Sequence, residues 1–186
     1  MIVTALHILG LHPVIVYNSN GYDKLETLRE IESWVDVYLP DFKYIDSALA
    51  KKYSDAISYP EIVKKSLAEM YRQKGSTLLM NELGEAERGI LVRHLVLPGH
   101  SENSIGVLQF IAQEISTSLH ISLMSQYHPT PFVNDISPLN RTLFKDEYQT
   151  VVEAFYHLGF RKGWIQDLDS YENYRPDFGK KHPFEH

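Results

Sequence analysis

The chain has 186 residues, of which 44% are hydrophobic and 23% are charged, and its formal net charge is −6. This length and apolar content are enough for one domain with a sizeable core. The acidic balance argues against a nucleic-acid partner, and no apolar run approaches the roughly 20 residues that span a bilayer, so we expect no membrane segment.

Cysteine is absent from the sequence. This absence excludes disulfides, a cysteine nucleophile, a thiolate zinc site and cysteine ligation of an iron–sulfur cluster by these residues. It also fits a reducing compartment, so we expect a cytoplasmic protein.

Hydrophobic periodicity predicts helices and short buried strands that alternate along the chain. The predicted helices cover residues 1–11, 23–33, 47–53, 60–72, 104–116 and 145–158. The predicted strands cover residues 14–17, 34–39, 89–97, 121–125 and 163–166. The first helix has no cap ahead of it, so the sequence reads as if it starts inside a helix of a longer protein.

Two irregular regions interrupt this alternation. A hairpin-like excursion over residues 77–85 leads into the third strand, and a loop rich in Pro and Asn covers residues 129–140. Strands that alternate with helices through short links indicate βαβ units and a parallel sheet, the α/β class. We expect this architecture over residues 1–166 and an irregular C-terminal tail over residues 167–186.

Polar side chains stand at or near the carboxyl end of every predicted strand, which is where parallel sheets bind ligands. In chain order they are Asn18, Ser19 and Asn20; Asp41 and Lys43; Arg93 and His94; Gln126, Tyr127 and His128; and Gln166.

Each of these residues also has a structural interpretation. Asp41 is also explained as a turn residue and Lys43 as a solvated charge. Arg93 lies within an apolar run, where it is costly unless it is paired, so a structural ion pair with Asp41 is the alternative to a binding role. His94 faces the opposite side of the strand and is expected to pack against a helix. The nine histidines show no HxH or HExxH spacing, which disfavours a histidine metal site.

Five strings in the order VIVYNSNGY, VDVYLPDFKY, AKKYS, RGILVRHLVLPGH and ISLMSQYHP carry a family resemblance. Together they resemble the activating-enzyme branch of the radical S-adenosylmethionine superfamily, of the pyruvate formate-lyase activating enzyme type. The resemblance extends over nearly the whole chain.

That resemblance implies a partial, TIM-like β/α barrel. It also implies a 4Fe–4S cluster held by a CxxxCxxC loop, S-adenosylmethionine bound to the cluster, and a 5′-deoxyadenosyl radical that forms a glycyl radical on a partner enzyme. The cysteine loop and the first strand are missing from this sequence. We therefore expect a barrel truncated at its N-terminal side that has no cluster and is inactive on its own.

The resemblance also assigns site residues. The LPDFK string implies that Asp41 and Lys43 face S-adenosylmethionine, and the RHLVLPG string makes Arg93 a partner of its carboxylate or ribose. The remaining strand ends imply cofactor contacts from Asn18 and Ser19 in the Asn-Gly turn, and from Gln126 or His128 near the ribose or adenine.

Two other functions remain open at this stage. One is a β/α-barrel lyase with Lys43 as a Schiff-base amine, although a neighbouring Asp41 favours the charged form of lysine. The other is a non-enzymatic module that binds a nucleotide or another chain. A truncated sheet has an exposed edge, so we also expect a dimer through that edge.

Overall fold

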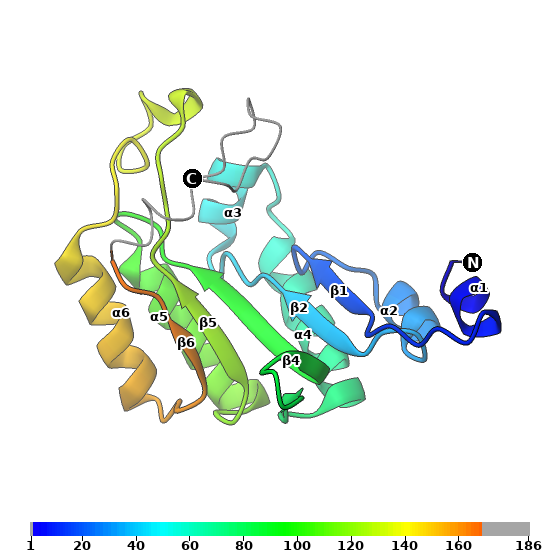
Figure 1. Ribbon diagram of the computed structural model, residues 1–186. Helices are drawn as coiled ribbons and strands as arrows, with labels where there is room; N and C mark the ends of the chain where they lie inside the picture. The colour runs from blue at the N-terminus through cyan, green and yellow to red at the C-terminus, as the bar shows by residue number, and fades with distance from the viewer. Residues whose placement is uncertain (1, 169–186) are drawn as a thin grey trace.

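The computed structural model describes residues 2–168 and shows helices packed on one face of a twisted sheet (Figure 1). The α-helices are α1 (Ile2–Ile8), α2 (Leu25–Ile31), α3 (Ser47–Ser54), α4 (Tyr59–Lys74), α5 (Ser101–Phe110) and α6 (Lys145–His157). The strands are β1 (Val16–Ser19), β2 (Val37–Pro40), β3 (Leu79–Met80), β4 (Ala86–Leu95), β5 (His120–Met124) and β6 (Gly163–Ile165). A π-helical turn, η1 (Ile111–Ile115), extends α5, and a 3₁₀ turn, η2 (Pro131–Val133), lies in the loop before α6.

Five strands form a parallel sheet in the order β1-β2-β4-β5-β6, and β3 pairs with β4 in an antiparallel hairpin. The strands β1 and β6 stand at the two ends of this order, so the sheet is not closed. The predicted α/β class, its parallel strands and the incomplete TIM-like barrel are confirmed.

Side chains alternate between the two faces along each strand. In β4, Ile90, Val92 and His94 are fully buried toward the helices. The helix α4 packs on this side through Val63, Leu67 and Met70, each at most 1% exposed. Burial of one such side chain contributes about 1.5–3 kcal/mol, so this helical layer holds the sheet together.

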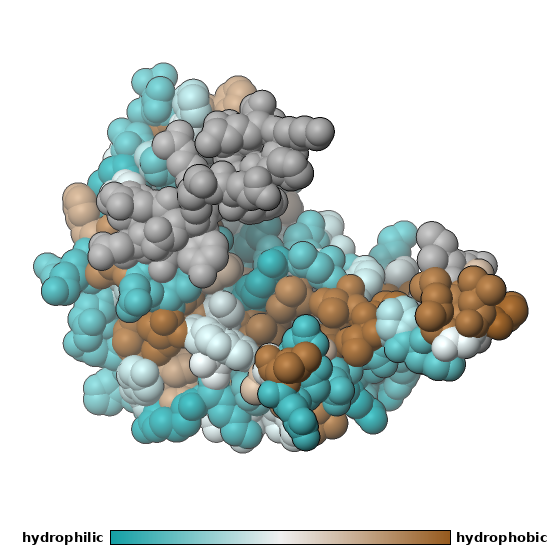
Figure 2. All heavy atoms as spheres, in the orientation of Figure 1, coloured by the Kyte–Doolittle hydropathy of each residue, from teal (hydrophilic) through white to brown (hydrophobic). Residues whose placement is uncertain are grey.

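The opposite face of the sheet is open among the described residues, and Figure 1 looks directly onto it. Apolar side chains lie across the middle of this face in Figure 2, and Val16, Leu79, Met80 and Trp164 are each about half exposed. Leu91, Arg93 and Leu95 of β4 also point to this side and are partly exposed. The open face is therefore the side of the sheet on which a ligand could bind.

Several predicted boundaries shift in the structure. The first strand begins at Val16 rather than at residue 14 and includes Asn18 and Ser19, which the sequence places in a turn. The second begins at Val37, because Trp34 and Val35 still donate backbone hydrogen bonds to the last turn of α2. Within residues 2–168, no helix has the length and apolar content needed to cross a membrane. Residues 169–186 of the predicted tail lie outside the described residues.

Candidate ligand-binding site

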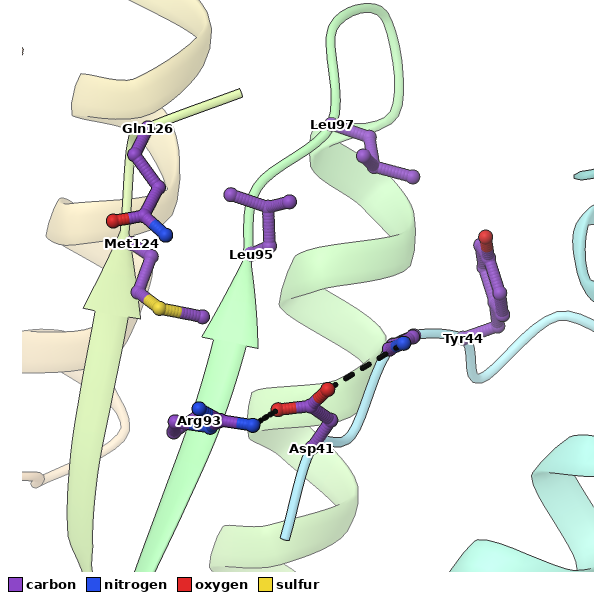
Figure 3. A pocket seen from close by; sticks show the side chains of 8 residues that line it. Asp41, Tyr44, Arg93, Leu95, Leu97, Met124 and Gln126 are labelled. Carbon is purple, nitrogen blue, oxygen red and sulfur yellow. Dashed lines mark ion pairs between the residues drawn. The ribbon is translucent and has the colours of Figure 1, made fainter. Parts of the chain in front are cut away.

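A cavity of about 360 Å³ lies at the carboxyl ends of β2, β4 and β5 on the open face of the sheet (Figure 3). Its size is within the range of small-molecule sites. Its wall combines charged, polar and apolar side chains: Asp41, Lys43, Tyr44, Arg93, Leu95, Leu97, Met124 and Gln126. Four residues predicted from the sequence thus line one cavity, and they are Asp41, Lys43, Arg93 and Gln126.

A line of alternating charges crosses one side of the cavity. Lys43 Nζ is 3.4 Å from Asp41 Oδ2, and Arg93 Nη2 is 2.6 Å from Asp41 Oδ1. Arg93 Nη2 also donates a hydrogen bond of 2.8 Å to Asn18 Oδ1. Two cations share one carboxylate, so the cluster has an excess positive charge in a chain whose net charge is −6. Such a cluster favours a ligand with an anionic group.

The strand register explains why these residues meet. Asp41 and Arg93 form a parallel bridge just beyond β2, and the backbone N–H of Phe42 donates to the carbonyl oxygen of Arg93 at 2.9 Å. On the other side, the N–H of Asp41 donates to the carbonyl oxygen of Ser19 at 2.8 Å. The pleat places Asp41 and Arg93 on the same face of the sheet, so the ion pair follows from the backbone pairing.

Two buried atoms of this ion pair lack an aligned hydrogen-bond partner within residues 2–168. They are Arg93 Nε and Asp41 Oδ1. Asp41 Oδ1 lies within ion-pair distance of Arg93 Nη2, but this contact does not have the alignment of a hydrogen bond. Buried polar atoms without partners are uncommon and often mark a place where a ligand or water binds. The ion pair therefore retains hydrogen-bonding capacity next to the cavity.

The hydroxyl of Tyr59 joins the two loops that carry this side of the cavity. Tyr59 is 4% exposed, its oxygen accepts the backbone N–H of Lys43 at 3.0 Å, and its O–H lies 2.9 Å from Asn20 O and 3.1 Å from Asp41 O. Burial raises the pKa of Tyr59 above its ordinary value, so the phenol stays neutral and keeps its proton. This residue was not predicted, and no sequence pattern marks it.

His94, next to Arg93 in the chain, faces the helices and is completely buried. Its Nδ1 is 2.6 Å from the carbonyl oxygen of Phe42, which can only accept, so Nδ1 carries the proton. Burial lowers the pKa of His94 to about 4, and the carbonyl contact and the charge of Asp41 oppose this change. The prediction that His94 packs against the helical layer is confirmed.

The other predicted site residues are arranged differently around this cavity. Gln126 lines it, and Asn18 reaches it through Arg93. Ser19 forms a hydrogen bond with Asp23 and accepts the N–H of Gly21, so its hydroxyl organises the turn after β1. His128 lies half-buried in the loop after β5, its Nδ1 has no partner within residues 2–168, and it is not among the lining residues. Cofactor contacts from Ser19 and His128 stay predictions.

Comparison with known proteins bears on the fold. A domain of pyruvate-formate lyase-activating enzyme from Bacteroides vulgatus superposes with a TM-score of 0.59 over 89% of this chain and 88% of that domain. The chain has the fold of this domain. The two sequences are 16% identical, so the likeness extends to the fold alone.

Sequence comparison adds one curated relative, an uncharacterized protein of Methanocaldococcus jannaschii, which is 26% identical over 153 residues. The match covers 82% of this chain and 40% of the relative, so the chain spans well under half of that protein. No family model matches the sequence.

The residues of the cavity fit one of the two groups that the resemblance of the five sequence strings implies. Lys43, Arg93 and Gln126 offer donors for a carboxylate and a second polar group, which suits S-adenosylmethionine. They do not fit a 4Fe–4S cluster, because the sequence has no cysteine, and no cluster of three or more metal-binding side chains occurs in the described part of the chain.

Proposed function

We propose that the cavity binds S-adenosylmethionine and that Lys43 and Arg93 hold its carboxylate. The observation that carries this proposal is the line of Lys43, Asp41 and Arg93, in which two cations share one carboxylate at the edge of a partly apolar cavity. The likeness in fold to an activating-enzyme domain supports the same choice of ligand.

The two cations contribute in different ways. The side chain of Lys43 is 45% exposed and provides a mobile point charge, whereas the guanidinium of Arg93 is fixed between Asp41 and Asn18. A fixed, planar guanidinium suits a carboxylate geometrically. Because the side chain of Arg93 is already ordered in the free protein, it loses little conformational entropy when a ligand binds. Leu95, Leu97 and Met124 provide an apolar wall that excludes water from the uncharged part of the ligand.

For a longer protein that contains this chain, we propose S-adenosylmethionine-dependent formation of a glycyl radical on a partner enzyme. A 4Fe–4S cluster supplies the electron in that chemistry, and its ligands would have to come from residues other than these 186. We assign this chain the binding of the sulfonium ligand and no step that involves the cluster.

Calorimetric titration of the chain with S-adenosylmethionine tests the proposal. We expect Lys43→Gln and Arg93→Gln each to weaken binding by ~10-fold or more, because a hydrogen bond to a charged group contributes about 1.5–3 kcal/mol. Lys51→Gln is the matched control, since Lys51 is an exposed lysine of α3 that pairs with Asp55 and does not line the cavity.

A second ligand separates the carboxylate from the rest of the molecule. 5′-Methylthioadenosine keeps the adenosine and lacks the carboxylate, so we expect Lys43→Gln to leave its affinity unchanged. No binding of S-adenosylmethionine to the wild-type chain, or equal losses for both ligands, contradicts the assignment.

The geometry argues against Lys43 as a Schiff-base amine. Its Nζ lies 3.4 Å from Asp41 Oδ2, so a Schiff base at Lys43 would have to form in place of this ion pair. Covalent trapping of a carbonyl compound at Lys43 by borohydride would favour the lyase over the function proposed above.

A further inference from the structure

Two glutamines meet side by side at the carboxyl ends of β5 and β6. Gln166 directly follows β6, and its Nε2 is 3.0 Å from Oε1 of Gln126. Its own Oε1 is 3.1 Å from the backbone nitrogen of Ser125. The backbone N–H of Gln166 donates to the carbonyl oxygen of Leu123 at 3.0 Å, which fixes its place beside β5. Gln126 lines the cavity, whereas Gln166 is not among the lining residues.

These contacts determine which way each amide points. The two ends of an amide group are similar in shape, so their orientation follows from their partners. The backbone N–H of Ser125 can only donate, so it must face the oxygen of Gln166. The nitrogen of Gln166 is then the end that faces Gln126, and as a donor it requires the oxygen of Gln126. The NH₂ group of Gln126 is left for the cavity, and Figure 3 shows it on that side.

Two other side chains of the wall, those of Lys43 and Arg93, are also donors, and the hydroxyl of Tyr44 lies 3.1 Å from Ser54 Oγ. Lys43 and Arg93 are cations, and both oxygens of Asp41 face those cations. With the NH₂ of Gln126 added, the wall offers donors at two separate places, one at the end of β2 and one after β5. Its matching ligand therefore carries an anionic group, such as a carboxylate, and a second, uncharged acceptor, such as a ring nitrogen or a hydroxyl or carbonyl oxygen.

We propose that Gln166 is a positioning residue that holds Gln126 as a hydrogen-bond donor to the ligand, and that it thereby selects an acceptor group at this place. This inference rests on the proposed function, because it concerns the same cavity. It adds to that function a second contact with the ligand, made by Gln126, and the residue that orients this contact, Gln166.

Gln166→Glu inverts the orientation with little change in shape. One carboxylate oxygen still accepts the N–H of Ser125, and the other can only accept, so Gln126 must turn its NH₂ toward residue 166 and its oxygen toward the cavity. We expect S-adenosylmethionine to bind ~10-fold more weakly, since an acceptor then faces an acceptor. Gln109→Glu, the same change on the exposed side of α5, should leave the affinity unchanged.

A double-mutant cycle separates positioning from added charge. If Gln166 acts through Gln126, Gln166→Glu has no further effect in a Gln126→Ala background. An equal loss in both backgrounds overturns the proposal, because it shows that the substitution at Gln166 does not act through Gln126.

Side-chain amide exchange in the ligand-free chain, followed by NMR, decides the orientation without any ligand. We expect the NH₂ of Gln166 to be protected and that of Gln126 to exchange freely, and protection to move to Gln126 in Gln166→Glu. A protected Gln126 in the wild-type chain overturns the proposal. Failure of the wild-type chain to bind S-adenosylmethionine would overturn the proposed function instead, and the amide exchange would still decide the orientation.

Discussion

The geometry of the cavity depends on the hydroxyl group of Tyr59, and Tyr59→Phe removes only this group. In the folded chain this oxygen accepts the backbone N–H of Lys43, and its proton is shared between the carbonyl oxygens of Asn20 and Asp41. The variant keeps the ring and its packing. It therefore tests the hydrogen bonds between the two loops and little else.

The expected loss follows from these contacts. One net hydrogen bond contributes about 1 kcal/mol, and a buried N–H left without a partner, here that of Lys43, costs about 1–3 kcal/mol. We expect Tyr59→Phe to lower the free energy of unfolding by about 2–4 kcal/mol, which for a chain of this size lowers the Tm by about 4–16 °C.

Urea denaturation measures this change, and Tyr38→Phe is the matched control. Tyr38 is fully buried on the helical side of β2, and its hydroxyl donates to Gln73 Oε1 at 2.5 Å. Its loss should cost about 1 kcal/mol. We also expect weaker binding of S-adenosylmethionine in Tyr59→Phe and not in Tyr38→Phe. If the Tyr59 variant is no less stable than the Tyr38 variant, the hydroxyl does not join the loops as described.

Three further predictions concern pH and backbone geometry. Burial lowers the pKa of His94 to about 4, so the unfolded chain binds a proton at a higher pH than the folded chain does. The free energy of unfolding should therefore fall by about 1.4 kcal/mol per pH unit as the pH drops from 6.5 toward 4. Urea denaturation at several pH values should show this slope in the wild type and not in His94→Asn. Hydrogen bonds from Arg141 hold the pKa of Glu147 at about 2. The contribution of the Glu147 carboxylate to stability is therefore complete above pH 4.5 and is lost as the pH falls toward 2. The difference in Tm between the wild type and Glu147→Gln should shrink over that interval. Gly21 has φ +78° and an added Cβ would lie 2.4 Å from the carbonyl oxygen of Asp41, so Gly21→Ala should lower the Tm more than Gly75→Ala, which adds a Cβ at a similar φ in open space.

The sequence was sufficient to predict the order of the elements and the parallel sheet, because runs of buried residues and helical spacing are local signals. It was less informative at the strand ends. Asn18 and Ser19 were assigned to a turn by residue type, yet their backbone pairs with β2, since pairing depends on the neighbouring strand.

The ion pair between Asp41 and Arg93 was predictable for a different reason. An arginine in an apolar run needs a partner, and a carboxylate at the end of the neighbouring strand can supply it. The parts of the site that escaped prediction depend on distant contacts. Tyr59 acts through three backbone groups of other loops, and the role of Gln166 follows from the register between β5 and β6. Neither relation leaves a pattern in the local sequence.

Arg93 and His94 are neighbours in the chain that serve opposite surfaces of β4. If β4 slipped by one residue, the imidazole would turn into the cavity and the guanidinium would enter the buried layer between the sheet and the helices, where an unpaired charge costs several kcal/mol. The charge of Arg93 thus also disfavours a shifted alignment of the central strand. A variant that neutralises Arg93 should therefore be judged for alternative strand pairings as well as for lost affinity.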